Sequence, residues 1–94
     1  MQVLNQEGIN YFYVDVRELN GYMYPDSLTI KLSKEGCKSF YFEPTLNICY
    51  NSLEIKFGIN QCLDKTGVYK IEILNAVKET IYQNFIQIST TNAR

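Results

Sequence analysis

Histidine and tryptophan are both absent from the 94 residues of this chain. Without histidine, the chain cannot form a Ser–His–Asp triad, a Cys–His nucleophile pair or a histidine-ligated metal site. The five glycines stand apart in the sequence, so no glycine-rich phosphate loop is present, and no calcium loop of the D-x-[DN]-x-[DN]-G type occurs. These absences favour a protein that is not an enzyme and that needs no cofactor or metal.

Long apolar runs and clustered basic residues are also missing. No stretch of about 18 apolar residues exists, so no membrane span is expected. The first ten residues, "MQVLNQEGIN", lack a basic flank followed by an apolar stretch, so we expect no signal peptide and synthesis in the cytoplasm. The net charge is −1, whereas a nucleic-acid-binding protein gathers cations on one face. The densest basic stretch, "KLSKEGCK" (31–38), is interpreted as a solvated strand end and turn.

Three cysteines, Cys37, Cys49 and Cys62, form neither an even set nor a closely spaced pair. A disulfide framework and a zinc site of the C-x-x-C type are therefore not indicated. We expect three reduced, buried thiols, with a bridge between two of them left open. The carboxylates fall on expected polar faces or in turns, where we expect them to be solvated: Asp15, Glu18, Asp26, Glu43, Glu54 and Glu72.

What the chain does contain is alternation of apolar and polar residues, in a composition that is 46% hydrophobic and 20% charged. Alternation of this kind is typical of antiparallel strands that bury one face. Turn-forming residues separate the runs. The sequence predicts one domain, 1–94, with strands near 9–18, 27–33, 38–43, 46–50, 53–60, 68–74 and 80–89. Such short, evenly spaced strands are typical of a sandwich or a barrel.

The segment 75–88 supports two interpretations. Its apolar residues recur at helical spacing from Leu74, and Asn75 is a suitable helix N-cap. However, "TIYQNFIQIST" (80–90) is rich in β-branched and aromatic residues, which disfavour a helix. We favour a strand. Strict alternation puts Ile81 and Phe85 on one face and Ile86 and Ile88 on the other, and a β-bulge near Gln83–Phe85 would correct this change of parity. An α+β fold with a helix at about 75–88 is the alternative.

Asp64, Gly67, Tyr69 and Ile71 form the pattern D-x-x-G-x-Y-x-I. It resembles the immunoglobulin-like pattern D-x-G-x-Y-x-C at the start of the penultimate strand, with one additional residue before the glycine. The resemblance implies a tyrosine corner, in which the buried tyrosine bonds back to the backbone upstream. Ile71 stands where antibody domains have a cysteine, so an all-hydrophobic core is implied. The expected fold is an all-β, immunoglobulin-like antiparallel sandwich of about seven strands.

In general character the chain also resembles small immunoglobulin-like modules of tailed bacteriophage particles, which are short, poor in histidine and rich in Asn, Ile, Lys and Tyr. The resemblance implies a non-enzymatic structural or interaction module that is incorporated in a virion. Its role there would be capsid decoration, fibre anchoring or a place in the baseplate or tail. Its partners would be other virion proteins or copies of itself. The sequence itself indicates no membrane partner, and its charge distribution disfavours nucleic acid as a partner.

Aromatic clusters supply the candidate contact residues. By parity, Phe12, Phe40 and Phe42 face the core and the neighbouring tyrosines face outward. Outward tyrosines stabilise cross-strand pairs or dominate protein interfaces. The segment "GYMYPDS" (21–27) is unusually apolar for a loop. The predicted interaction residues are Tyr11, Tyr13, Tyr22, Met23, Tyr24 and Tyr41.

Two other functions remain open at this point. An OB-like barrel would use exposed aromatic residues to stack single-stranded nucleic acid. A small intracellular regulatory or inhibitor protein would fit the α+β alternative. Salt-sensitive oligonucleotide binding distinguishes the first alternative, and a helical circular dichroism spectrum distinguishes the second.

Overall fold

The computed structural model describes residues 2–19, 27–59 and 66–89. Its regular elements are eight β-strands and one short 3-10 helix, Val16–Glu18. The strands are β1 (Val3–Asn5), β2 (Gly8–Asp15), β3 (Thr29–Ser33), β4 (Phe40–Phe42), β5 (Thr45–Cys49), β6 (Ser52–Ile59), β7 (Gly67–Leu74) and β8 (Thr80–Ser89). No helix in these ranges is long and apolar enough to cross a membrane. The fold is all-β.

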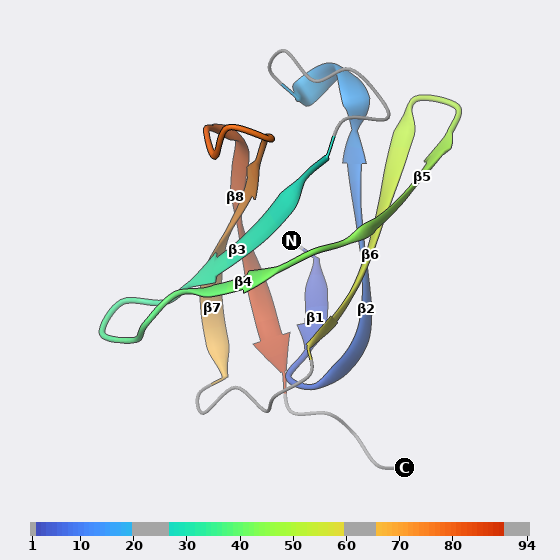
Figure 1. The fold of residues 1–94 in the computed structure, drawn as a ribbon. Helices are drawn as coiled ribbons and strands as arrows, with labels where there is room; N and C mark the ends of the chain where they lie inside the picture. The colour runs from blue at the N-terminus through green and yellow to red at the C-terminus, as the bar shows by residue number, and fades with distance from the viewer. Residues whose placement is uncertain (1, 20–26, 60–65, 90–94) are drawn as a thin grey trace, which may run out of the picture.

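The strands form two sheets that face each other (Figure 1). The larger sheet has the order β1-β8-β7-β3-β4, and the smaller sheet has the order β2-β6-β5. The chain crosses from the larger sheet to the smaller one between β4 and β5. All neighbouring strands are antiparallel except β1 and β8, which run parallel. The molecule is therefore a two-layer sandwich with one parallel pair.

Alternating apolar side chains fill the space between the sheets. The inward residues of β6 and β7 are fully or almost fully buried, as the alternation predicts. Two ring pairs join the layers: Phe12 meets Tyr82 edge-on with ring centroids 6.1 Å apart, and Phe42 lies 5.6 Å from Phe57. Burial of such side chains contributes about 1.5–3 kcal/mol each. Side chains from both sheets thus contribute to one hydrophobic core.

The last strand confirms the strand interpretation of the C-terminal segment. Residues 75–88 contain no helix, and β8 spans 80–89. The α+β alternative was wrong because "TIYQNFIQIS" pairs residue by residue with β7. Ile73 lies opposite Tyr82, but Leu74 lies opposite Thr80, so one residue is extra in β8. The irregularity therefore falls at Ile81, before the Gln83–Phe85 position that the parity predicted.

The sequence analysis did not predict β1. This strand is three residues long, and its parallel partner lies more than 80 residues further along the chain. On the other side of β1, the Asn10 side chain makes the hydrogen bonds that a neighbouring strand would make. The Asn10 Oδ1 accepts from the Asn5 N–H at 2.8 Å, and the Asn10 Nδ2 donates to the Asn5 carbonyl at 3.1 Å. Asn10 belongs to the smaller sheet and is buried. Its amide therefore links the two layers through β1.

The start of β7 has the conformation that the D-x-x-G-x-Y-x-I pattern requires. Gly67 has φ +121°, which is accessible to glycine and rarely to other residues. Tyr69 is 1% exposed and belongs to the core, and the Lys34 ammonium lies 5.7 Å from its ring centroid. Ile71 is also fully buried, as the pattern implied. Asp64 lies outside the described residues, and the tyrosine corner that the pattern implied stays a prediction.

Candidate functional site

A small group of exposed apolar side chains lies on part of the outer face of the larger sheet. Val3 of β1 and Val68 of β7 both lie opposite Gln87 of β8, one on each side. Phe85 stands two residues before Gln87 on the same face. The three apolar side chains expose between 47% and 63% of their surface. We call Val3, Val68, Phe85 and Gln87 the β8 patch. It brings exposed apolar groups from three adjacent strands together.

A shallow hollow of about 570 Å³ adjoins the β8 patch. Val68, Lys70 and Phe85 form one side, and the turn 33–37 between β3 and β4 forms the other. Lys34, Glu35 and Lys70 contribute charge to this otherwise small and apolar lining. An apolar patch beside a hollow with a polar rim is the arrangement found in protein contact sites.

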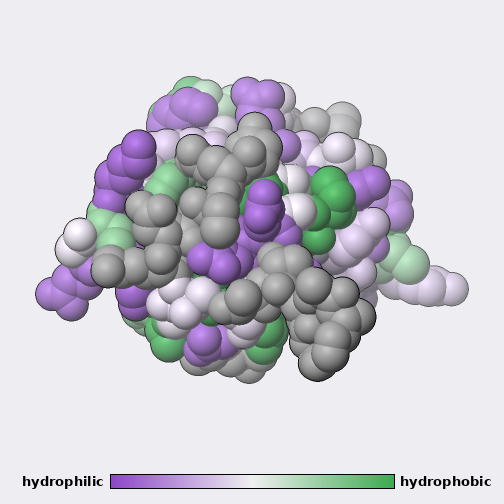
Figure 2. Space-filling view, turned by 90° about the horizontal axis from the view of Figure 1, so that it is seen from below, coloured by the Kyte–Doolittle hydropathy of each residue, from purple (hydrophilic) through white to green (hydrophobic). Residues whose placement is uncertain are grey.

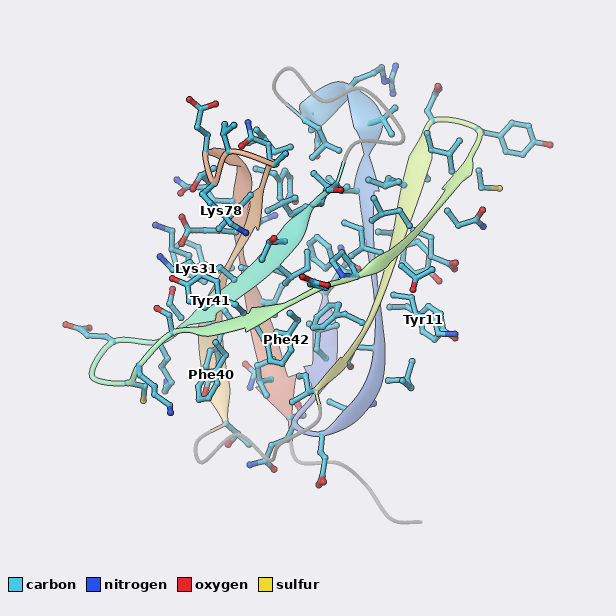
Figure 3. All side chains as sticks on the ribbon, viewed as in Figure 1. Tyr11, Lys31, Phe40, Tyr41, Phe42 and Lys78 are labelled. Carbon is cyan, nitrogen blue, oxygen red and sulfur yellow. The ribbon has the colours of Figure 1, made fainter. Side chains whose placement is uncertain are left out.

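A polar row crosses the same face farther from the patch. Tyr41 on β4, Lys31 on β3 and Glu72 on β7 lie side by side in register. The Lys31 ammonium is 5.9 Å from the Tyr41 ring centroid and 3.7 Å from a Glu72 carboxylate oxygen (Figure 3). Thr80 donates to the other Glu72 oxygen at 3.1 Å. Glu72 is thus largely buried, contrary to the expectation that every carboxylate is solvated.

The smaller sheet carries the other two predicted tyrosines of the described chain. Tyr11 faces outward beside Lys56, whose ammonium lies 6.0 Å from its ring centroid. Tyr13 donates its hydroxyl to a Glu54 carboxylate oxygen at 3.0 Å. This hydrogen bond, followed by slight desolvation and the negative charge of Glu54, raises the pKa of Tyr13 above its ordinary value. Both tyrosines make the cross-strand pairs that stabilise an exposed sheet face.

The predicted interaction residues do not form one surface. Tyr11 and Tyr13 lie on the smaller sheet and Tyr41 lies on the opposite side of the sandwich (Figure 3). All three face outward, as predicted, but their contact role stays a prediction. Three further predicted residues lie outside the described ranges: Tyr22, Met23 and Tyr24.

The residues of the β8 patch were absent from the predicted site. The alternation of β7 predicts that Val68 faces outward, because it precedes the buried Tyr69. Phe85 was placed on the same face as Ile81, but the irregularity at Ile81 puts Phe85 on the outer face. Val3 gave no signal, because its strand was not recognised.

Figure 2 shows one end of the sandwich. Apolar groups there stand as separate areas among hydrophilic ones, in the part of the view that grey atoms do not cover (Figure 2). Its scattered apolar groups match the ordinary surface of a globular protein.

Charged and thiol groups do not gather into a reaction centre in the part of the chain that the structure describes. No group of three or more Cys, Asp or Glu side chains is placed to hold a metal ion within these ranges. Asp15 accepts from the side chain and the backbone N–H of Arg17, and these bonds lower the pKa of Asp15 to about 2. Cys37 and Cys49 are free thiols.

The expectation of buried cysteines was wrong for both described thiols. Cys37 is half-buried in the β3–β4 turn, and Cys49 is exposed at the end of β5. Cys62 lies outside the described residues. Comparison with known proteins adds no assignment: no protein-family model matches the chain, and no curated protein matches it.

Proposed function

We propose that the chain is a non-enzymatic interaction module that binds a protein partner through the β8 patch. The observation that carries the proposal is the gathering of Val3, Val68 and Phe85 on three adjacent strands, each exposed by about half or more. An exposed apolar patch beside a hollow with a polar rim supports a protein contact at this face. Phe85 is the expected anchor, because aromatic residues dominate interface energetics.

The strand connections support an immunoglobulin-like class for this module. In that class one sheet contains strands B, E and D, and the other contains C′, C, F and G. Here β2, β6 and β5 occupy the positions of B, E and D, and β4, β3, β7 and β8 occupy those of C′, C, F and G. The buried Tyr69 and the positive φ of Gly67 fall in β7, the penultimate strand, where the tyrosine corner belongs.

We also propose that the partner belongs to a bacteriophage particle or is a further copy of this chain. The support is the short, histidine-free composition, rich in Asn, Ile, Lys and Tyr, and the sandwich scaffold. The module would then contribute shape and surface to an assembly rather than chemistry.

Site-specific photo-crosslinking in the producing cells tests the docking face. A photoreactive phenylalanine analogue replaces Val68 in the β8 patch, and the same analogue replaces Tyr11 on the opposite face as a matched control. We expect a discrete protein adduct from position 68, lost when Phe85→Ser is added and retained when Tyr13→Ser is added. Adducts from position 11 alone, or an adduct at position 68 that Phe85→Ser leaves unchanged, would refute this face. The identity of the adduct then decides whether the partner is a particle protein.

A further inference from the structure

The exposed sides of the β-strands are protected unequally in this molecule. The Tyr13 N–H and carbonyl at the free side of β2 are both bonded to the Gln2 side-chain amide, at 3.2 and 2.8 Å. The Asn10 side-chain amide hydrogen-bonds to the Asn5 N–H and carbonyl at the free side of β1. On β8, beyond the end of β1, the Asn84 side chain accepts from the Phe85 N–H at 2.8 Å. Side-chain amides thus take the place of a neighbouring strand.

Among the residues that the structure describes, none protects the free side of β5 in these ways. The strand is Thr45–Cys49, "TLNIC", with no charged residue, proline or glycine. Natural edge strands usually carry charges, proline or bulges, or are very short, and these features prevent pairing with another chain. The edge strand β4, for example, has only three residues. Ile48 faces inward by register with Leu53, but it remains 38% exposed because β5 lies at the edge of the smaller sheet. This edge is open in both its backbone and its side chains.

The backbone groups available on β5 follow from the hairpin that joins it to β6. Cys49 and Ser52 face each other across the two-residue loop, and in such a hairpin this closing pair exchanges hydrogen bonds. Bonded and non-bonded residues alternate along an antiparallel pair. Leu46 and Ile48 therefore direct their N–H and carbonyl groups away from β6. No hydrogen bond reaches either residue from outside the smaller sheet in the described chain.

We propose that this edge pairs with the same edge of a second copy of the chain, antiparallel, with a two-fold axis at Asn47. In this register each Leu46 lies opposite the second copy's Ile48, so the outward N–H and carbonyl groups of both residues form four hydrogen bonds. Asn47 then faces the second copy's Asn47 as a non-bonded pair. The two smaller sheets become one continuous sheet of six strands. This contact is separate from the β8 patch and does not depend on it.

A second copy fits this edge better than an unrelated segment, because the register is complementary to itself. In this register, residues with free N–H and carbonyl groups lie opposite residues of the same kind. The exposed Ile48 also lies beside the apolar Leu46 of the second copy. Glu54 is the nearest acidic residue, one strand behind Asn47. Three strand spacings separate the two copies' Glu54 residues, about 14 Å, which exceeds the screening length of about 8–10 Å at physiological salt. No like charges oppose the contact.

The hairpin tip beside this edge supplies a further observation. Tyr50 is 96% exposed and has φ +58°, an uncommon conformation for a tyrosine. Continuing the proposed register by one residue places it opposite the second copy's Pro44, where its ring gains an apolar neighbour. Pro44 has no N–H, so the paired segment ends there. A five-residue edge is smaller than the interfaces of stable dimers, and we expect reversible association in the micromolar to millimolar range.

Paired charge variants test the register without altering the core, because Asn47 faces solvent. Sedimentation velocity of the wild-type chain over a wide concentration range should show a reversible monomer–dimer equilibrium. Asn47→Lys and Asn47→Asp each place like charges at the axis, and each should weaken self-association roughly fivefold. An equimolar mixture should regain it, because Lys then faces Asp. A wild-type chain that stays monomeric throughout, or charge variants that dimerise like the wild type, would overturn the proposal.

Amide hydrogen exchange separates this contact from the β8 patch. The Leu46 and Ile48 amides should gain protection as concentration rises, whereas the Asn47 amide should change little because it already bonds to β6. Asn47→Ser is the neutral control and should behave as the wild type. If dimers form but protection rises around Val68 and Phe85 instead, the edge proposal fails and the docking face proposed above gains support.

Discussion

Replacing Gly67 by alanine should destabilise the fold markedly, because the start of β7 depends on a backbone conformation that alanine rarely adopts. At φ +121° a non-glycine residue carries strain of about 1–3 kcal/mol. The added Cβ would also lie 3.1 Å from the Lys34 ammonium, which sits over the Tyr69 ring. Displacing Lys34 removes a cation–π contact worth about 0.5–2 kcal/mol. Alanine also lowers the conformational entropy of the unfolded chain, which offsets about 0.4–1 kcal/mol of this loss in stability.

The net expectation for Gly67→Ala is a loss of about 1–3 kcal/mol in the free energy of unfolding, and a Tm lower by roughly 5–20 °C. Urea unfolding followed by far-UV circular dichroism measures it, with an unchanged slope confirming that only stability has changed. Gly58→Ala is the matched control. Gly58 lies within β6 outside the positive-φ region, and an added Cβ would meet only Ile9 Cδ1 at 3.4 Å. This variant should gain about 0.4–1 kcal/mol. Equal midpoints for the two variants would refute the reasoning.

Three further changes probe the core, the β1 attachment and the surface charge. Ile71→Ala should cost about 2–5 kcal/mol, measured by urea unfolding, because it empties a fully enclosed position; a loss below 1 kcal/mol would contradict that burial. Asn10→Leu removes the hydrogen-bond partners of the Asn5 N–H and carbonyl, and each unsatisfied group should lower the free energy of unfolding by about 1–3 kcal/mol. Hydrogen exchange should then show β1 opening before the rest of the fold. Asp15 should titrate near pH 2 by NMR. Its folded pKa is depressed, so its stabilising effect is complete above the ordinary value of 3.8 and is lost as the pH falls towards 2. Arg17→Gln should return that pKa towards its ordinary value.

Much of the fold is predictable from this sequence because half-buried strands leave a strong alternating pattern. Seven strands were placed within a few residues of their positions, and the buried Tyr69 was identified from its neighbours. β1 was not predictable for a physical reason. Its three residues carry too little pattern, and its stability comes from the distant β8 and from the Asn10 amide. Neither contact is local in sequence.

The candidate site was less predictable than the fold. The alternating pattern correctly predicted that Tyr11 and Tyr41 face outward. It does not show which sheet each strand joins. Tyr11 and Tyr41 lie on opposite faces of the molecule because β2 joins the smaller sheet and β4 joins the larger one. The sequence did not show which face Phe85 takes, because its parity depends on where the extra residue of β8 lies; that residue is Ile81 and not one near Gln83–Phe85. Surface sites built from several strands depend on such irregularities.

Docking at the outer face of the larger sheet is tested most directly by hydroxyl-radical footprinting. Side-chain oxidation is compared between the purified chain and the assembly recovered from producing cells through an affinity tag. We predict that oxidation of Phe85 falls severalfold in the assembly, while oxidation of Tyr11 on the opposite face stays the same. Protection of Tyr11 with Phe85 unchanged would contradict the account.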